Sequence, residues 1–464
     1  MSQTVKITSP VDGSVYAERP LASDAEIDKA LDAARAAAAG WRATPLAERA
    51  RILEAAVEAM NAMKADIVPE LAWQMGRPVK FGGFEIAGGF TERARHMTAI
   101  APEALADIPV AAKDGFTRFL RREPLGTVFV IAPWNYPFLT AVNTIWPALM
   151  AGNAVILKHA SQTLLVGERF QTALDKAGLP KGLFRNLVMS HAQATRVIQS
   201  GRIAQVSFTG SVEGGRAIER AAAGHFIGVG LELGGKDPAY VRADANLDHA
   251  VENLVDGSFF NSGQSCCGIE RIYVDRKVYP KFVEGFIALT RTYVLDTPLD
   301  EKTTLGPMVN ARAADFVRGQ VEAAVRGGAT AHIDPKTFAR DAKGSAYMAP
   351  QVLTEVNHQM SVMREESFGP VIGIMPVAGD DEAVKLMNDS QYGLTAAVWT
   401  SDADAAERLG RDIETGTVFM NRCDYLDPAL AWTGVKETGR GITLSRLGYE
   451  QLTRVKSYHL RTRI

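Results

Sequence analysis

Cysteine is scarce in this chain of 464 residues, and its scarcity excludes one class of fold. The three cysteines are Cys266, Cys267 and Cys423. Two of them are neighbours in sequence, a spacing at which the geometry of a disulfide is hard to reach. A scaffold held together by disulfides is therefore excluded, and reduced thiols indicate a cytoplasmic protein.

Charge of one sign and long hydrophobic runs are also lacking. The formal net charge is −2, so the chain carries no basic field for nucleic acid. No apolar run reaches the roughly 18 residues that span a membrane, and residues 1–13 lack the apolar segment of a signal peptide. Neither nucleic acid nor membrane is expected as a partner. The remaining composition, 47% hydrophobic and 22% charged, is typical of a globular protein, and the length predicts two or three domains of about 150 residues each.

The first 110 residues carry helix patterns. Ser23 and Glu26 have the spacing of a capping box, and an alanine-rich run follows them to Trp41. A second amphipathic helix is expected over residues 47–64. This region is therefore predicted to be helical.

From Gly126 onward, short apolar runs rich in β-branched residues alternate with helical stretches. This alternation is typical of parallel sheets with both faces covered, and such sheets bind ligands at the carboxyl ends of their strands. A second alternating region follows Asp237, so two α/β domains in tandem are predicted. The expected strands are 127–131, 154–157, 183–188, 205–208 and 227–233 in the first region, and 272–274, 371–376, 396–400 and 417–420 in the second.

Two glycine-rich segments are candidates for phosphate binding. Gly230–Lys236 has the spacing of a P-loop, but Asp237 stands where serine or threonine should hold Mg²⁺, which argues against an NTPase. Gly210–Gly215 lies between a predicted strand and a predicted helix, where glycines allow a backbone to approach a pyrophosphate. Taken alone, the second segment fits a tight turn equally well.

Two further segments are candidates for catalysis. Cys266 follows Gly263 and Gln264 in a loop-like stretch, where a thiolate can act as a nucleophile, although most lone cysteines are buried and inert. Pro133–Pro137 ends a strand and holds Asn135 between two prolines, either as a rigid structural turn or as an oxyanion donor. No Cys-x-x-Cys pair occurs and no histidine stands near these cysteines in sequence, so no metal site is expected.

Taken together and in this order, the segments resemble the aldehyde dehydrogenase superfamily over nearly the whole chain. The matching segments are Pro133–Pro137, Phe208–Ser211, Leu231–Lys236, Gly263–Cys266, Glu366–Pro370 and Gly434–Gly439. The resemblance implies an α/β fold of two Rossmann-like domains with a small oligomerisation β-extension. The expected parts are a cofactor-binding domain over 1–111 and 126–235, a catalytic domain over 236–424, oligomerisation strands over 112–125 and 448–464, and a substrate-tunnel loop over 425–447 that returns to the cofactor domain.

The resemblance also implies the chemistry, an NAD(P)-dependent oxidation of an aldehyde to a carboxylic acid. Cys266 is similar to the family's nucleophile, which forms a thiohemiacetal and then a thioester. Asn135 and the backbone N–H of Cys266 would hold the oxyanion, and Glu232 would activate the hydrolytic water. Two alternatives remain open: a relative that passes its acyl group to coenzyme A, which the presence of Glu232 disfavours, and a non-catalytic homologue.

The cofactor positions of the family also have counterparts here, with one departure. Where relatives carry a glutamate that binds the adenosine ribose and repels a 2′-phosphate, this chain has Ser161, so NADP should be accepted as well as NAD. Lys158 and His159 are expected to assist. The other implied cofactor residues are Trp134, Gly210, Ser211 and Gly215 at the pyrophosphate, and Glu366 and Phe368 at the nicotinamide end.

The substrate pocket departs from relatives that oxidise succinic semialdehyde. Asn143 and Phe260 stand where those relatives carry two arginines that bind the substrate's carboxylate. The pocket positions Tyr136, Phe260, Leu426 and Trp432 are apolar or aromatic, which favours an uncharged aliphatic or aromatic aldehyde. The alternative is a semialdehyde dehydrogenase whose arginine comes from elsewhere in the chain, for example Arg422.

Assembly is implied by two segments. The charged strand Thr117–Glu123 and the terminal strand Val455–Leu460 are expected to form an intersubunit sheet, as they do in relatives. A homodimer or homotetramer is therefore predicted.

Overall fold

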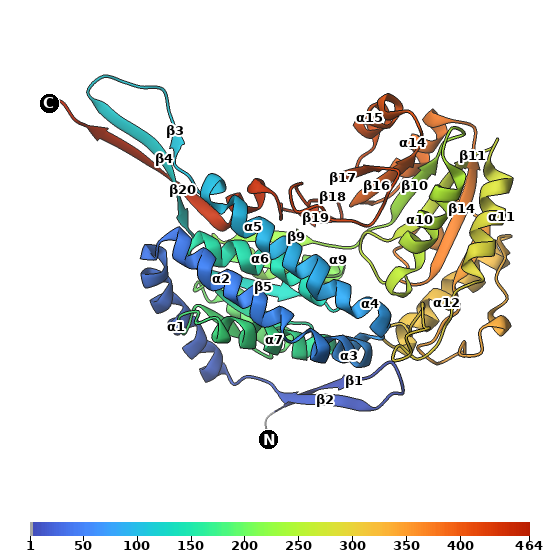
Figure 1. Ribbon diagram of the computed structural model, residues 1–464, viewed down its shortest axis with the longest axis horizontal. Coiled ribbons are helices and arrows are strands. Elements are labelled where there is room, and N and C mark those ends of the chain that lie inside the picture. Colours follow the sequence, from blue (N-terminus) through green and yellow to red (C-terminus); the bar gives the residue numbers. More distant parts are fainter. Residues whose placement is uncertain (1–2) are drawn as a thin grey trace.

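Six strands form a mostly parallel sheet in one half of the molecule (Figure 1), and the computed structural model describes residues 3–464. The strand order is β19-β9-β8-β5-β6-β7, and only β19 runs antiparallel to its neighbour. Every residue of β5 and of β6 is buried, which explains their continuous apolar sequences. The strands are β5 (Thr127–Ala132), β6 (Ala154–His159), β7 (Phe184–Asn186), β8 (Gln205–Thr209), β9 (Gly228–Glu232) and β19 (Gly439–Arg440).

Helices that precede these strands in the sequence, and helices that lie between them, pack around the sheet. Together with the sheet they form one hydrophobic core. Helix α1 begins at the expected capping box, because the Ser23 hydroxyl accepts from the N–H of Glu26. Helix α6 is apolar on nearly all sides and is correspondingly buried. The helices are α1 (Asp24–Ala43), α2 (Leu46–Asn61), α3 (Lys64–Met75), α4 (Val79–Gly83), α5 (Thr91–Ala104), α6 (Pro137–Ala151), α7 (Leu164–Lys176), α8 (His191–Gln199) and α9 (Val212–Ala222), with a π-helical segment, Phe84–Phe90, before α5.

A second sheet of seven strands forms the other half, in the order β12-β13-β14-β11-β10-β16-β17. All its neighbours are parallel except β12 and β13. The strands are β10 (Asp237–Val241), β11 (Ile269–Asp275), β12 (Thr330–Ala331), β13 (Gln351–Thr354), β14 (Val371–Val377), β16 (Thr395–Trp399) and β17 (Thr417–Met420). The helices are α10 (Leu247–Phe259), α11 (Tyr279–Thr290), α12 (Ala311–Arg326), α13 (Ser361–Arg364), α14 (Asp380–Asn388) and α15 (Ala403–Asp412).

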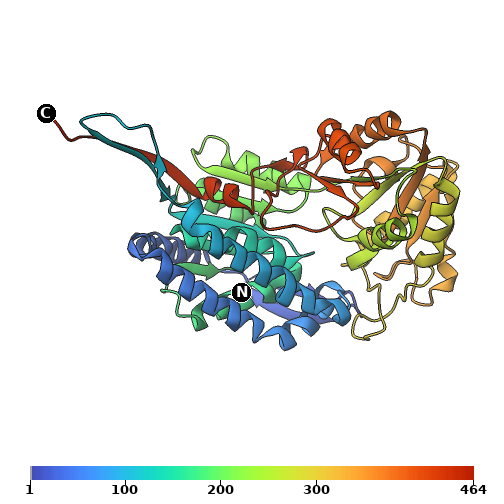
Figure 2. The same cartoon turned by 45° about the horizontal axis from the view of Figure 1, so that its top comes forward.

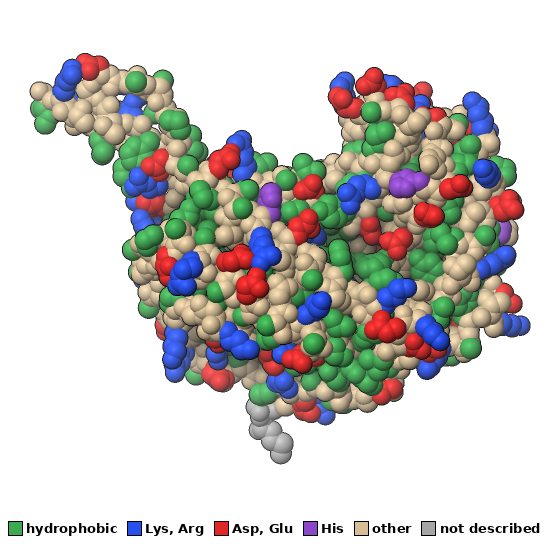
Figure 3. Space-filling view, viewed as in Figure 1, with side chains coloured by type: hydrophobic (Ala, Val, Ile, Leu, Met, Phe, Trp, Pro, Cys, Tyr) green, Lys and Arg blue, Asp and Glu red, His purple; other side chains and the backbone are tan. Residues whose placement is uncertain are grey.

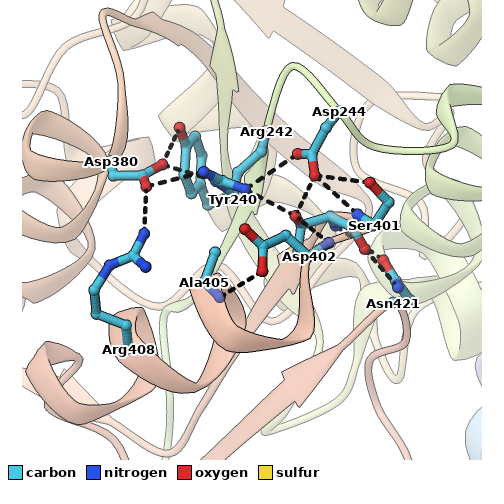
Figure 4. Close-up of polar contacts among 10 residues, drawn as sticks. Tyr240, Arg242, Asp244, Asp380, Ser401, Asp402, Ala405, Arg408 and Asn421 are labelled. Atoms are coloured by element: carbon cyan, nitrogen blue, oxygen red, sulfur yellow. Dashed lines mark hydrogen bonds and ion pairs between the residues drawn. The ribbon is translucent and has the colours of Figure 1, made fainter.

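A polar cluster at the carboxyl end of β10 fastens two helices to this sheet (Figure 4). Arg242, just after β10, donates to Asp380 at the start of α14 over 2.9 Å. Asp244 accepts from the hydroxyl of Thr400 over 2.7 Å, and Asp402 caps α15. These charged groups are partnered within the protein, so the cluster is structural.

A three-stranded antiparallel sheet projects from the body as an arm in both views (Figures 1 and 2). Its order is β20-β4-β3, built from β3 (Ile108–Pro109), β4 (Phe116–Pro124) and β20 (Thr453–Arg461). Lys456 lies opposite Arg121, so the two segments expected to be strands pair with each other within one chain. Among the described residues, the outer edge of β20 has no strand beside it.

The N-terminal region departs from the helical prediction. Residues 4–20 form a β-hairpin of β1 (Thr4–Thr8) and β2 (Val15–Pro20). Polar and apolar residues alternate in β1, but a period of two over so short a segment gives only a weak signal. The strands expected in the two parallel sheets are confirmed, with ends that shift by up to three residues.

The surface and the helices add two observations. On the face shown in Figure 3, basic and acidic side chains are interspersed. Across residues 3–464, each helix is too short or too polar to cross a lipid bilayer.

Candidate active site

A cavity of about 380 Å³ is lined by residues from both halves of the molecule. Glu232 reaches it from the end of β9 in the six-stranded sheet, and Cys266 from the loop before β11 in the seven-stranded sheet. The cavity also brings together all five residues predicted for the substrate pocket: Tyr136, Asn143, Phe260, Leu426 and Trp432.

The loop that carries Cys266 has an unusual backbone that is held firmly in place. Asn261, Ser262 and Gly263 have φ angles of 54°, 57° and 70°, in the left-handed region. A side chain at Gly263 would collide with the carbonyl oxygen of Gly369, so only glycine fits there. The side-chain oxygen of Gln264 accepts from the N–H of Val309 over 2.7 Å, which ties the loop to the segment before α12.

The two adjacent cysteines have different surroundings. The Cys266 side chain is half-buried at the cavity, whereas Cys267 is only 5% exposed and belongs to the hydrophobic core. A hydrogen bond with Cys267, burial and nearby carboxylates raise the pKa of Cys266 well above its usual value. These surroundings favour the thiol form of Cys266, and loss of its proton makes it nucleophilic.

Asn135 lies beside the same loop and is held from behind by a buried ion pair. Its amide nitrogen donates to the carbonyl oxygen of Gln264 over 3.2 Å, and its main-chain carbonyl oxygen accepts from Arg77 over 2.6 Å. Arg77 is paired with Glu85, which also accepts from the N–H of Phe138 at the start of α6. Sequence patterns do not reveal the ion pair, because its partners meet Asn135 only in the folded chain.

The Glu232 carboxylate is buried at the cavity and accepts two hydroxyl hydrogen bonds. Thr209 donates to one oxygen over 2.9 Å and Thr443 to the other over 2.5 Å. Burial raises the pKa of Glu232, and the two threonines oppose that rise. A carboxylate with a raised pKa can take a proton from water near neutral pH, as a general base requires. Thr443 lies 211 positions away in the sequence, and no local pattern predicts its contact with Glu232.

The residues predicted for the adenosine and pyrophosphate end lie at the carboxyl ends of neighbouring strands. Trp134 follows β5, Lys158 is the penultimate residue of β6, and Gly210 and Ser211 follow β8. Ser211 caps α9, and its hydroxyl accepts from the N–H of Gly214 over 3.2 Å. The remaining predicted residues, Ser161 and Gly215, stand just after β6 and inside the first turn of α9.

This edge of the sheet suits an anionic dinucleotide. Lys158 is only 4% exposed, yet its ammonium group has neither a hydrogen bond nor an ion pair with any described residue. Burial lowers the pKa of this ammonium group, so a ligand with anionic or hydroxyl oxygens would relieve an unfavourable burial. Ser161 beside it is exposed and carries no negative charge.

His159 does not assist at this edge, contrary to expectation. Its ring is buried and contacts the carbonyl oxygen of Pro137 at 3.3 Å and the hydroxyl of Thr163 at 3.1 Å. Burial lowers the pKa of His159 to about 4, so the ring is neutral at physiological pH. It therefore supplies no positive charge for a phosphate.

The residues predicted for the nicotinamide end come from the opposite half. Glu366 accepts from the N–H of Gly235 over 3.0 Å, and burial raises its pKa to about 8. The Phe368 ring meets Trp134 edge to face at 5.6 Å between centroids. Glu270, which is ion-paired with Lys236, accepts from the N–H of Phe368 over 2.9 Å and fixes this segment. The predicted cofactor residues therefore frame the junction between the two sheets.

Two arginines line the cavity, and the sequence points to only one of them. Arg422 is exposed, and its guanidinium stacks 4.0 Å from the Tyr425 ring centroid. Arg93, on α5, is buried. The spacing of Gly89 and Arg93, four residues apart in a helical run, places both on one face, but nothing in the sequence shows that this face lines the cavity. No group of three or more His, Cys, Asp or Glu suited to a metal ion occurs within residues 3–464.

Comparison with known proteins gives consistent matches. Residues 1–458 match the Aldehyde dehydrogenase family. Succinate-semialdehyde dehydrogenase [NADP(+)] of Mycobacterium avium is 34% identical over 97% of this chain and 95% of its own. The structure of succinic semialdehyde dehydrogenase from Streptococcus pyogenes with NADP+ is similar with a TM-score of 0.93 and 27% identity, over 98% of this chain and 100% of that chain. PnpE of a Pseudomonas species, solved with nicotinamide adenine dinucleotide, also gives a TM-score of 0.93 and 27% identity, over 99% of this chain and 94% of that chain.

Proposed function

Because the chain belongs to the aldehyde dehydrogenase family and oxidises aldehydes with NAD(P), we propose that Cys266 is its nucleophile and Glu232 its general base. The Cys266 thiol gives up its proton to solvent and its thiolate attacks the aldehyde carbon, while Asn135 Nδ2 and the Cys266 N–H hold the oxyanion that forms. NAD(P)+, when bound, supplies the acceptor for the hydride. The thioester left on Cys266 is then hydrolysed by a water whose proton passes to Glu232.

One observation carries this assignment: Cys266 and Glu232 come from different sheets and line one cavity. The Asn135 amide beside the Cys266 loop adds an oxyanion donor at the same place. Initial rates of NADH and NADPH formation with an aldehyde panel test the proposal, with the single variants of Cys266 and Glu232 as controls.

For cofactor choice, we propose that NADP is accepted because Ser161 places no carboxylate at the adenosine ribose and Lys158 adds a positive charge there. Ser161→Glu should shift the ratio of kcat/KM for NADP over NAD towards NAD by about tenfold or more, because a carboxylate repels a 2′-phosphate and binds a 2′-hydroxyl. Steady-state rates with both cofactors give the ratio, and Ser161→Ala, which adds no charge, should leave it nearly unchanged. Strict NAD dependence of the parent protein would contradict the proposal.

For assembly, we propose a homodimer or a dimer of dimers joined through the arm. Val455 and Leu460 on β20 are 55% and 50% exposed, which is unusual for apolar residues of a strand at an open edge. Deleting residues 455–464 should leave folded protein. Its subunits should dissociate at a protein concentration at least about tenfold higher than the concentration at which the parent protein dissociates. Light scattering over a dilution series measures this, and a parent protein that is monomeric at micromolar concentration would refute it.

The three free cysteines support a cytoplasmic location.

Two substrate classes fit the family assignment. Tyr136, Phe260, Leu426 and Trp432 provide the apolar wall that favours an uncharged aldehyde. Two of the relatives named above are succinate-semialdehyde dehydrogenases, and the Arg93 side chain in the cavity supports a carboxylated aldehyde for this chain too. We propose the second class, because a buried arginine in a substrate cavity is difficult to reconcile with a wholly apolar ligand.

A further inference from the structure

Arg93 is a buried cation that the protein leaves incompletely satisfied. Only 5% of the residue is exposed, and no carboxylate among the described residues forms an ion pair with it. Its Nη1 donates to the carbonyl oxygen of Leu139 over 2.7 Å and weakly to Asn143 Oδ1 over 3.4 Å. Its Nε is buried and has no partner. Such a charge is costly to bury unless an anion completes its surroundings.

Asn143, which contacts Arg93, also has a buried side-chain donor without a partner. The residue is 1% exposed, and its Nδ2 is also buried without a partner. Its amide orientation is determined by Arg93, because turning the amide would place two donor groups against each other. Arg93 and Asn143 therefore each keep an unused donor, and both line the cavity that holds Cys266.

The other charged groups of the cavity do not pair with Arg93 directly. Glu232 attracts it electrostatically, but the two Glu232 oxygens accept from Thr209 and Thr443. Asp256 and Arg422 are exposed, which places them towards the cavity mouth. Burial raises the pKa of Asp424 well above its usual value, which weakens the repulsion of an entering anion. Glu92 accepts from the Tyr425 hydroxyl over 2.6 Å.

We propose that Arg93 and Asn143 form a carboxylate-binding site for the far end of an aldehyde substrate whose carbonyl reacts at Cys266. The substrate is then an aldehyde with a terminal carboxylate, and the inference rests on the proposed role of this cavity as the active site. The Arg93 guanidinium on α5 and the Asn143 amide on α6 both line the cavity and are groups that donate hydrogen bonds to carboxylates. The cation comes from Arg93, which is not one of the two positions where succinic semialdehyde-oxidising relatives carry arginine. Those two positions hold Asn143, which contributes an amide, and Phe260, which contributes a ring.

Matched four-carbon aldehydes test the site. The parent protein should oxidise succinic semialdehyde with a kcat/KM at least about tenfold above that for butanal and 4-hydroxybutanal. Arg93→Met keeps a long side chain and removes the charge, so it should lower kcat/KM for succinic semialdehyde by about 100-fold, mainly through KM, because the substrate carboxylate would be buried unpaired. Its kcat/KM for butanal should fall far less than that for succinic semialdehyde, and the circular dichroism spectrum of the variant shows whether it is folded.

Two further measurements distinguish Arg93 and Asn143 from Arg422 as the residues that bind the carboxylate. Arg422→Met removes the exposed arginine of the same cavity and should leave the substrate ratio unchanged. Succinate, which has carboxylates but no aldehyde, should inhibit butanal oxidation competitively in the parent protein and far less in Asn143→Leu. The inhibition measurement applies even if Arg93→Met does not fold.

Several results would overturn the carboxylate site and leave the proposed chemistry intact. The first is a kcat/KM of the parent protein for butanal or 4-hydroxybutanal that equals or exceeds its kcat/KM for succinic semialdehyde. The second is a lack of inhibition of the parent protein by succinate. Loss of the succinic semialdehyde preference in Arg422→Met rather than Arg93→Met would also overturn it. An absence of turnover with all three aldehydes would contradict the proposed function, and the inference with it.

Discussion

Cys266→Ala should abolish aldehyde oxidation, with a fall in kcat of at least about 10⁴-fold, whereas Cys267→Ala should retain substantial turnover. Removing a covalent nucleophile eliminates the reaction path and not merely one stabilising contact. Both cysteines line the cavity, but Cys267 belongs to the hydrophobic core and Cys266 is the more accessible. Rates of NADPH or NADH formation measure the difference.

The control is the affinity of both variants for NAD and NADP, measured by the quenching of tryptophan fluorescence. Cys266→Ala should bind the cofactors nearly as well as the parent protein, because the predicted cofactor residues lie at the ends of β5, β6 and β8 and in the Glu366 segment. If Cys267→Ala were the inactive variant, the assignment of the nucleophile would be wrong.

The parts of the site that the sequence predicts are those defined by short segments. Strands β5 and β6 are buried on both faces, so their apolar runs identify them without tertiary information. Gly263 is required by a local left-handed backbone beside Gly369. Cys266 and Glu232 stand in segments with recognisable neighbours, and the structure brings them to one cavity.

The parts that the sequence does not predict depend on contacts between distant segments. Thr443 reaches Glu232 from a position 211 residues away, and Arg77 supports Asn135 from one 58 residues away. His159 follows a lysine that is expected to bind the cofactor, but its side chain is buried on the other face of β6, as alternation along a strand requires. Arg93 is one of two arginines on α5, and the sequence does not single it out, because its burial is set by how α5 packs against α6.

The arm illustrates the same limit for the fold. The alternation of polar and apolar residues in β20 predicts a strand. It does not predict which residue of β4 lies opposite each residue of β20. Lys456 and Glu123, which pair across these two strands, lie 333 positions apart. Pairing between segments so far apart has no local signal in one sequence.

Glu232→Gln should slow hydrolysis of the thioester far more than its formation. The amide keeps the shape of the side chain and can still occupy the site between Thr209 and Thr443, but it cannot take a proton from water. Loss of a general base lowers a rate by about 10²- to 10⁴-fold. Stopped-flow measurements should therefore show a rapid burst of reduced cofactor, close to one per active site, followed by very slow turnover.

The pH dependence of kcat gives this prediction a second test. Burial raises the pKa of Glu232, so turnover of the parent protein should fall as the pH drops through that raised pKa and the base becomes protonated. Thr443→Val removes a hydrogen bond that stabilises the carboxylate, which should move this acid limb to higher pH, while Glu232→Gln should lose the limb altogether. Loss of the burst together with turnover in Glu232→Gln would instead place Glu232 at the formation of the thioester, before hydrolysis, and an unchanged acid limb in Thr443→Val would assign the titration to another group.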